Sequence, residues 1–193
     1  MNKRRIMNKN EGYSLVEMII VIAIIAILTA AAMVTISIIH NAKAREAAST
    51  LEDALSEEQN NAKGKMCVVS GTQQPDYKFA LCVYKDSNKY YVKKGYYKGN
   101  GLSTDSASSY EFIKSENAGS GKGTSFSAYV TVKYVDGTGT EREIGSGDDA
   151  VYIIYDRQGA CIKGNGKFKF YRNGKGNLLS TVTLNRNGSH TSD

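Results

Sequence analysis

The residue least suited to its surroundings in this sequence is Glu17, a carboxylic acid at the start of a long apolar run. The segment that follows it, Met18–Ile39, contains no charged residue. An acid inside a membrane-spanning helix costs about 2.5–3.5 kcal/mol at the bilayer centre and somewhat less near the interface. Such a residue marks a functional position and needs a partner. Glu17 therefore predicts pairing chemistry rather than a passive anchor.

The element that must position Glu17 is a helix through Met18–Ile39. At ~1.5 Å per residue this segment is long enough to cross a hydrocarbon core of about 30 Å. The only proline of the chain is Pro75, so nothing in the segment interrupts a helix. Basic residues before it place the N-terminus in the cytoplasm and the rest of the chain outside. These residues are Lys3, Arg4, Arg5 and Lys9.

Three classes of protein share these features. A cleavable secretory signal has a basic start, an apolar run and small residues, and Ala30-Ala31-Ala32 suits its cleavage site. A plain signal anchor has the same flanks. Neither class accounts for Glu17, which leaves a third reading in which the helix has an assembly role.

The run Gly12-Tyr13-Ser14-Leu15-Val16-Glu17, followed by the apolar Met18–Leu28, resembles the prepilin leader and helix of type IV pilins and type II secretion pseudopilins. The resemblance implies that a membrane prepilin peptidase cuts between Gly12 and Tyr13 and methylates the new amine of Tyr13. It also implies that Glu17 pairs with the N-terminal amine of a neighbouring subunit, at an assembly platform in the membrane. The sequence departs from the usual motif at Tyr13, where Phe or Met is common, and at Glu11, where a basic or neutral residue is common.

Beyond the membrane segment, small and apolar residues recur at helical spacing between charged ones. This pattern predicts an amphipathic helix that continues to about Ala62 and stops at Gly64. Its stripe is expected to pack on the head of the same chain. The stripe consists of Ala44, Ala47, Ala48, Leu51, Ala54 and Leu55.

After Gly64 the sequence changes to short β-type segments separated by Gly- and Asn-rich turns, which predicts an antiparallel sheet. A hairpin of Met66–Ser70 with Lys78–Lys85 would bring Cys67 and Cys82 together as a disulfide and leave Cys161 unpaired. Lys94–Gly123 is expected to be a loop, broken by a short strand or turn at residues 110–114. Further strands are expected at Tyr90–Lys93, Phe126–Val135, Thr140–Ile144, Ala150–Tyr155, Lys167–Arg172 and Leu178–Leu184.

These elements predict an α+β, pilin-like fold, in which a long N-terminal helix packs on an antiparallel β-sheet head. The expected divisions are a leader at 1–12, a membrane and assembly helix at 13–39, an amphipathic continuation at 40–64 and a β-rich head at 65–193. Before assembly the chain would be a single-pass membrane protein, and afterwards part of a surface filament.

Little in the sequence suggests an enzyme. His40 is expected at the outer membrane edge and His190 in a C-terminal tail, so neither suggests a catalytic base. The run 119–124 lacks the glycine and hydroxyl spacing of a phosphate loop. Asp148-Asp149 does not follow a calcium-loop pattern, and the three cysteines do not have metal-site spacing. No cofactor is expected.

Two functions remain open, a structural filament subunit and a minor tip subunit that binds DNA in a competence pilus. The last 45 or so residues resemble minor pilins and pseudopilins of the type II secretion H-subunit kind, although Asn187 separates Arg186 from the final glycine of that pattern. The tyrosines near lysines suit either base stacking or half-buried sheet positions, and we favour the latter. A third possibility is a solitary surface protein with an uncut anchor. The candidate DNA contacts are Lys167, Lys169, Arg172, Lys175 and Arg186.

Overall fold

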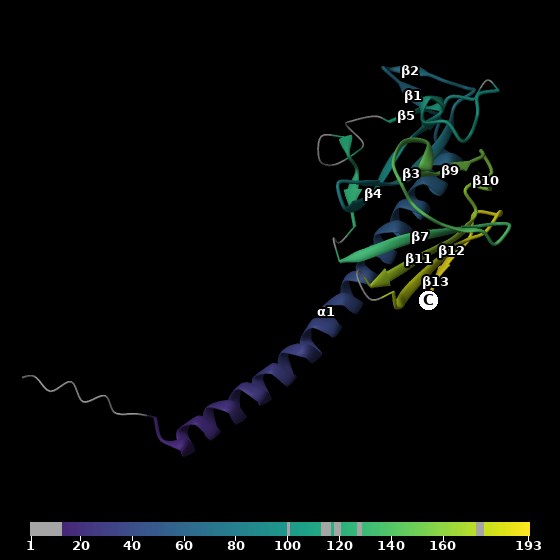
Figure 1. Ribbon diagram of the computed structural model, residues 1–193. Helices are drawn as coiled ribbons and strands as arrows, with labels where there is room; N and C mark the ends of the chain where they lie inside the picture. Colours follow the sequence, from purple (N-terminus) through teal and green to yellow (C-terminus); the bar gives the residue numbers. More distant parts are fainter. Residues whose placement is uncertain (1–12, 100, 113–116, 118–120, 127–128, 173–175) are drawn as a thin grey trace, which may run out of the picture. The chain divides into compact units, whose positions relative to one another are not determined.

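The computed structural model describes residues 13–99, 101–112, 117, 121–126, 129–172 and 176–193 (Figure 1). The leader with Gly12, part of the run 119–124 and Lys175 lie outside these residues. The chain divides into two units, Met1–Ile39 and His40–Asp193, and each is described by itself.

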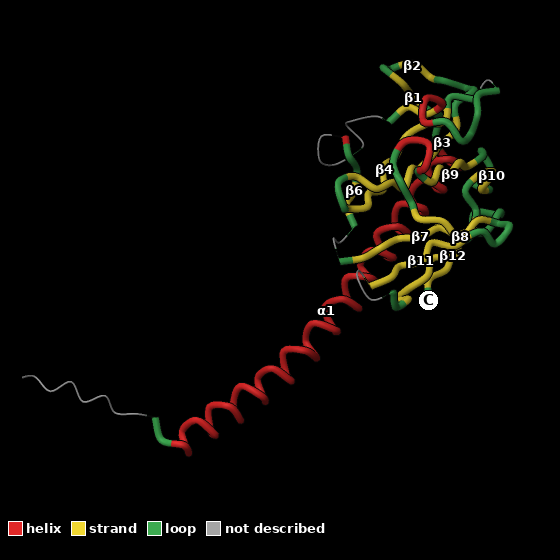
Figure 2. Tube along the Cα trace, in the orientation of Figure 1, coloured by secondary structure: helices red, strands yellow, loops and turns green. Residues whose placement is uncertain are grey.

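A single helix, α1 (Leu15–Gly64), runs through both units without interruption (Figure 2). In the first unit its large apolar side chains, from Leu15 to Ile39, are exposed. The hydroxyls there bond within the helix, where Thr29 donates to the carbonyl of Ile25 at 2.6 Å and Thr35 to that of Ala31 at 3.1 Å. The hydroxyls of this apolar part of α1 are therefore satisfied within the helix, as a lipid environment requires.

In the second unit, the predicted stripe of α1 is buried. Ala44, Leu51 and Leu55 are fully covered, and Ala47, Ala48 and Ala54 nearly so. They join one hydrophobic core with residues of both main sheets. The small alanines let the backbone of the helix come close to the strands, while the leucines fill the deeper positions.

The first main sheet is antiparallel and has the order β10-β9-β3-β4-β5, with β6 also paired to β4. Its central pair, β3 and β4, is joined by a turn in which Ser87 and Asn88 have positive φ. The strands are β3 (Lys78–Asp86), β4 (Lys89–Tyr97), β5 (Tyr110–Glu111), β6 (Thr124–Ser125), β9 (Val151–Tyr155) and β10 (Cys161–Lys163).

The second main sheet is also antiparallel and has the order β13-β12-β11-β7-β8. Alternate residues of its strands, including Val132, Phe168, Phe170 and Val182, enter the core beside α1. The prediction of a long helix packed on antiparallel sheets is therefore confirmed. The strands are β7 (Val130–Asp136), β8 (Glu141–Glu143), β11 (Gly166–Arg172), β12 (Leu178–Leu184) and β13 (His190–Ser192).

The predicted hairpin between 66–70 and 78–85 is wrong. The strand β1 (Val68–Val69) pairs with β2 (Thr72–Gln73), and the neighbours of β3 are β4 and β9. Cys67 lies in the core beside α1, whereas Cys82 points to the opposite face of its sheet and is a free, buried thiol. The Cys67–Cys82 disulfide is therefore absent from the structure, because the two side chains lie in different cores.

That opposite face of the first sheet carries a second, smaller core. Ala80, Cys82 and Ile154 are covered there by aromatic side chains, with the rings of Tyr110 and Tyr152 stacked 4.1 Å apart. Burial raises the pKa of Cys82 to about 12. In the expected loop Lys94–Gly123, β4 instead continues to Tyr97, and β5 (Tyr110–Glu111) lies within the short strand or turn expected at 110–114.

Candidate assembly site and head surface

The start of α1 is capped by two hydrogen bonds of Ser14, one with Glu17 and one with Val16. The backbone N–H of Ser14 donates to Oε2 of Glu17 at 3.0 Å, and the N–H of Val16 donates to Oγ of Ser14 at 3.3 Å. This arrangement is a variant of the capping box, in which the Ser hydroxyl accepts from the second rather than the third helical N–H, and two backbone donors at the helix start gain side-chain acceptors. Glu17 is thus partly satisfied within its own chain.

Around this cap, the side chains face outward. Tyr13 is 83% exposed, and the apolar residues after Glu17 are exposed on all sides of the helix. In the part of the chain that the structure describes, α1 is the one helix long and apolar enough to span a membrane. The second carboxylate oxygen of Glu17, Oε1, makes no hydrogen bond with another described residue, and the apolar surface around it is exposed.

Residues 7–33 match the family model for the prokaryotic N-terminal methylation motif. The chain carries the prepilin-type motif of type IV pilins and pseudopilins. No curated protein and no solved structure matches it significantly. The match covers residues 7–33, so it identifies the motif at the start of α1 and leaves the head without a matched family.

Glu17 was predicted from the sequence as a functional residue, whereas the role of Ser14 in holding it was not. The signal was present, because Ser14 and Glu17 have the Ser-x-x-Glu spacing of a capping box directly before an apolar run. Of the predicted processing pair, Tyr13 is described and exposed. The cleavage and methylation roles of Gly12 and Tyr13 stay predictions.

Of the four candidate DNA contacts that the structure describes, Lys167, Lys169 and Arg186 line one hollow, and Arg172 does not line it. Lys167 and Lys169 lie on the outward face of β11, Arg172 is at its end, and Arg186 lies in the turn after β12. The ammonium of Lys169 is 2.8 Å from Glu141, which also pairs with Lys133 at 3.0 Å. Hydrogen bonds from these two lysines lower the pKa of Glu141 to about 2.

The two histidines have structural surroundings. His190, which was expected in a tail, begins β13, and its Nε2 lies 2.9 Å from Oγ of Ser56 on α1. The expectation of a tail was wrong because Leu184 of β12 offers a free edge to pair with. The His40 ring lies 5.4 Å from that of Tyr129. Among the described residues, no cluster of three metal-ligating side chains is present.

Proposed function

We propose that this chain is a structural filament subunit, cleaved between Gly12 and Tyr13, methylated at Tyr13 and assembled through α1. The single observation that carries the proposal is the match of residues 7–33 to the methylation motif. Within that match, Glu17 lies in the first turn of α1, whose large apolar residues are exposed over Leu15–Ile39. The head then remains outside the cytoplasmic membrane and forms the surface of the filament.

Glu17 acts in this proposal as a selector for correct neighbours. Its carboxylate accepts one hydrogen bond from Ser14 and has no cation partner among the described residues. The amine of Tyr13 on an adjacent subunit would supply that cation, and a buried charge is tolerated only when its partner is in register. Apolar contact between helices supplies adhesion, and the ion pair supplies alignment.

The test is expression of the full chain with a prepilin peptidase, followed by intact-mass measurement and isolation of sheared filaments. We expect a mature, methylated N-terminus at Tyr13 in the wild type. Glu17→Ala should still be cut but be missing from the filament fraction. Thr29→Ala is the matched control, because it changes a polar side chain in the same segment whose hydroxyl is already bonded to Ile25.

Two results would count against the proposal. An uncut N-terminus in the wild type would make the chain a membrane-anchored surface protein. Normal incorporation of Glu17→Ala would remove the selector role of the carboxylate.

A further inference from the structure

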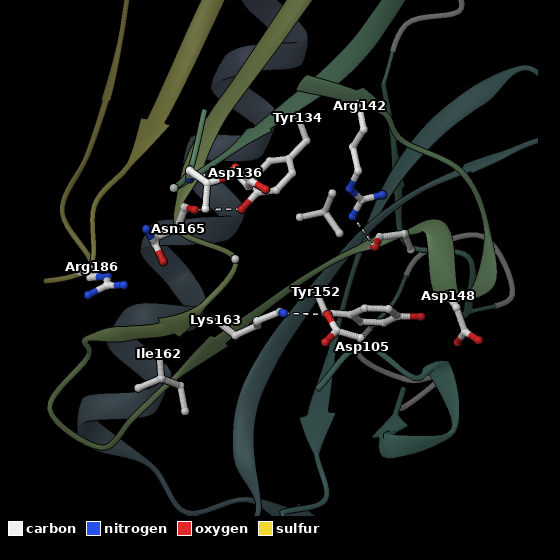
Figure 3. Close-up of a pocket in the computed structure, with 15 residues that line it drawn as sticks. Asp105, Tyr134, Asp136, Arg142, Asp148, Tyr152, Ile162, Lys163, Asn165 and Arg186 are labelled. Carbon is white, nitrogen blue, oxygen red and sulfur yellow. Dashed lines mark hydrogen bonds and ion pairs between the residues drawn. The ribbon is translucent and has the colours of Figure 1, made fainter. Parts of the chain in front are cut away.

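Two adjacent hollows lie where the second sheet ends against β9 and β10 of the first. One has a volume of about 470 Å³ and the other about 630 Å³. Figure 3 shows the first of them, with Asn165 and Arg186 among its labelled residues. The hollows form one trough because they share five lining residues: Asp136, Gly137, Thr138, Asn165 and Arg186.

Several cations of the trough are already engaged. The guanidinium of Arg142 donates to the carbonyl of Asp149 at 2.6 Å and to that of Ala150 at 3.1 Å. The ammonium of Lys163 pairs with Asp105 at 2.6 Å, a contact drawn in Figure 3. Lys169 is held by Glu141. These groups shape the trough and have little left to offer a ligand.

The acid at the centre of the trough is engaged as well. Oδ1 of Asp136 accepts from the N–H of Thr138 at 2.8 Å, from its hydroxyl at 2.6 Å and from the N–H of Thr140 at 3.0 Å. These hydrogen bonds, with that of the Thr138 hydroxyl first, lower the pKa of Asp136. The carboxylate of Asp136 thus stabilises the β7–β8 turn. The partial positive charges of its hydrogen-bond donors offset part of its negative charge.

Four polar side chains of the trough make no hydrogen bond or ion pair with another described residue, namely Lys167, Thr183, Arg186 and the amide of Asn165. Lys167 and Arg186 are exposed. The amide of Asn165 lies against the turn, where a Cβ added to Gly137 would be 3.2 Å from its Nδ2. The hydroxyl residue Thr183 lines the same wall of the larger hollow. This wall therefore combines two unpaired cations with neutral hydrogen-bonding groups.

We propose that this wall binds an acidic polysaccharide through a carboxylated sugar. Arg186 presents a planar fork that matches a carboxylate, and Lys167 adds a second positive charge. Asn165 and Thr183 are suited to the neutral hydroxyls of the same sugar, which require both donors and acceptors. The larger hollow, of about 630 Å³, is of the size range of small-ligand sites.

A nucleic acid fits the trough less well. Strands of nucleic acid bind through many phosphate contacts and through stacking on aromatic rings. The trough offers two unpaired cations, and its rings are covered. Tyr134 packs on Phe168, with centroids 5.0 Å apart, and Tyr152 stacks on Tyr110.

The experiment measures binding of the full chain in detergent to oligogalacturonate, to its methyl ester and to single-stranded DNA of equal charge. We expect the carboxylated oligomer to bind and the ester and DNA to bind at least tenfold more weakly. Arg186→Gln and Lys167→Gln should each weaken binding about tenfold. Arg157→Gln should not, because Arg157 lies outside the trough and donates to the carbonyl of Pro75.

Asn165→Ala separates sugar recognition from charge attraction, because it removes an amide without changing the net charge. It should weaken binding of the oligomer several-fold at constant ionic strength. The proposal is overturned if the oligomer does not bind, if DNA binds equally well, or if Arg186→Gln or Asn165→Ala binds as the wild type does. The thermal midpoint of each variant shows whether it is folded.

Discussion

The two halves of α1 share one continuous backbone but have different relations to the rest of the molecule. From Leu15 to Ile39 the apolar side chains are exposed, whereas from Ala44 to Leu55 the apolar stripe is buried in the head. The first half is apolar on all faces, and the second is apolar on one face only. A helix that is apolar all round requires lipid or other helices, whereas an amphipathic helix is completed by its own domain.

This difference separates folding from assembly. The second half belongs to the unit His40–Asp193, which contains both hydrophobic cores. Among the described side chains, the first half adds none to either core, and its large apolar side chains are exposed. Substitutions in the two halves should therefore affect different measurements.

The largest expected effect is the loss of a core leucine from the second half. Leu51 is fully buried, so Leu51→Ala should lower the free energy of unfolding by about 2–5 kcal/mol through lost contacts and a cavity. Leu28→Ala is the control, since Leu28 is 64% exposed and should leave head stability unchanged. Denaturant unfolding of the full chain in detergent, followed by tyrosine circular dichroism, measures both. Equal losses would mean that the two halves fold together.

The next largest effect on stability is expected where Gln59, Gly159 and Gly188 meet near the end of α1, a contact that we call the clamp. Gln59 of α1 donates to the carbonyl of Gly159 at 2.9 Å, and Gly188 packs over both. Gly188 has φ +83°, and a Cβ there would be 2.1 Å from the Gly159 oxygen, so Gly188→Ala should cost about 1–3 kcal/mol. Gly139→Ala has a similar φ of +92° but open space, which makes it the matched control. A smaller loss at Gly188 than at Gly139 would contradict the clamp.

The sequence was sufficient to predict α1 and the sheet-forming character of the head, because both follow from local periodicity. It was insufficient for pairing. β3 lies between β4 and β9, and residues 151–155 that form β9 are far from β3 in the chain. Short polar strands such as β13 have no alternation of their own and form because a longer strand offers an edge. The Cys67–Cys82 disulfide was predicted wrongly because it assumed a pairing of residues 66–70 with β3, whereas β1 pairs with β2 and β3 pairs with β4 and β9.

The two candidate sites differed in the same way. Glu17 could be recognised from the sequence alone, because a carboxylate directly before a long apolar run is unusual. The trough was not recognisable, because Gly137, Asn165 and Arg186 come from three turns that only the folded sheets bring together. Lys167 and Arg186 were noted as basic residues, but their lack of partners is visible only in the structure.

A smaller effect is expected at the start of the first half. Ser14→Ala removes the acceptor for the N–H of Val16 and should destabilise the first turn of α1 by about 0.5–2 kcal/mol. Amide exchange in detergent should accelerate over the first turn and remain unchanged after residue 40. Ser37→Ala is the control, because Ser37 donates to the carbonyl of Met33 and caps nothing. Unchanged exchange in Ser14→Ala would show that Glu17 alone sets the cap.

The smallest expected effect is on the pH dependence of stability, and it comes from Glu141, a carboxylate of the head that contrasts with Glu17. Glu141 has two lysine partners within its own chain, and these lower its pKa from 4.5 to about 2. A lowered pKa in the folded state stabilises the protein above pH 4.5, and this contribution is lost as the pH falls from about 4.5 to 2. Because Glu141 is at the surface and its pairs are screened, the loss in Glu141→Gln should be small and should shrink in high salt.

Unfolding midpoints of the full chain between pH 6 and 2 test this difference. Glu141→Gln should show a flatter decline than the wild type over that range, and Glu46→Gln, which loses a single exposed partner in Lys43, should follow the wild type more closely. Parallel curves for wild type and Glu141→Gln would show that the two lysine contacts do not persist in solution. The carboxylate of the head has its cations within the chain, so this pH effect should appear in the isolated subunit. Glu17 has no cation partner among the described residues of its own chain, so the effect of its pairing should appear only in assembled filaments.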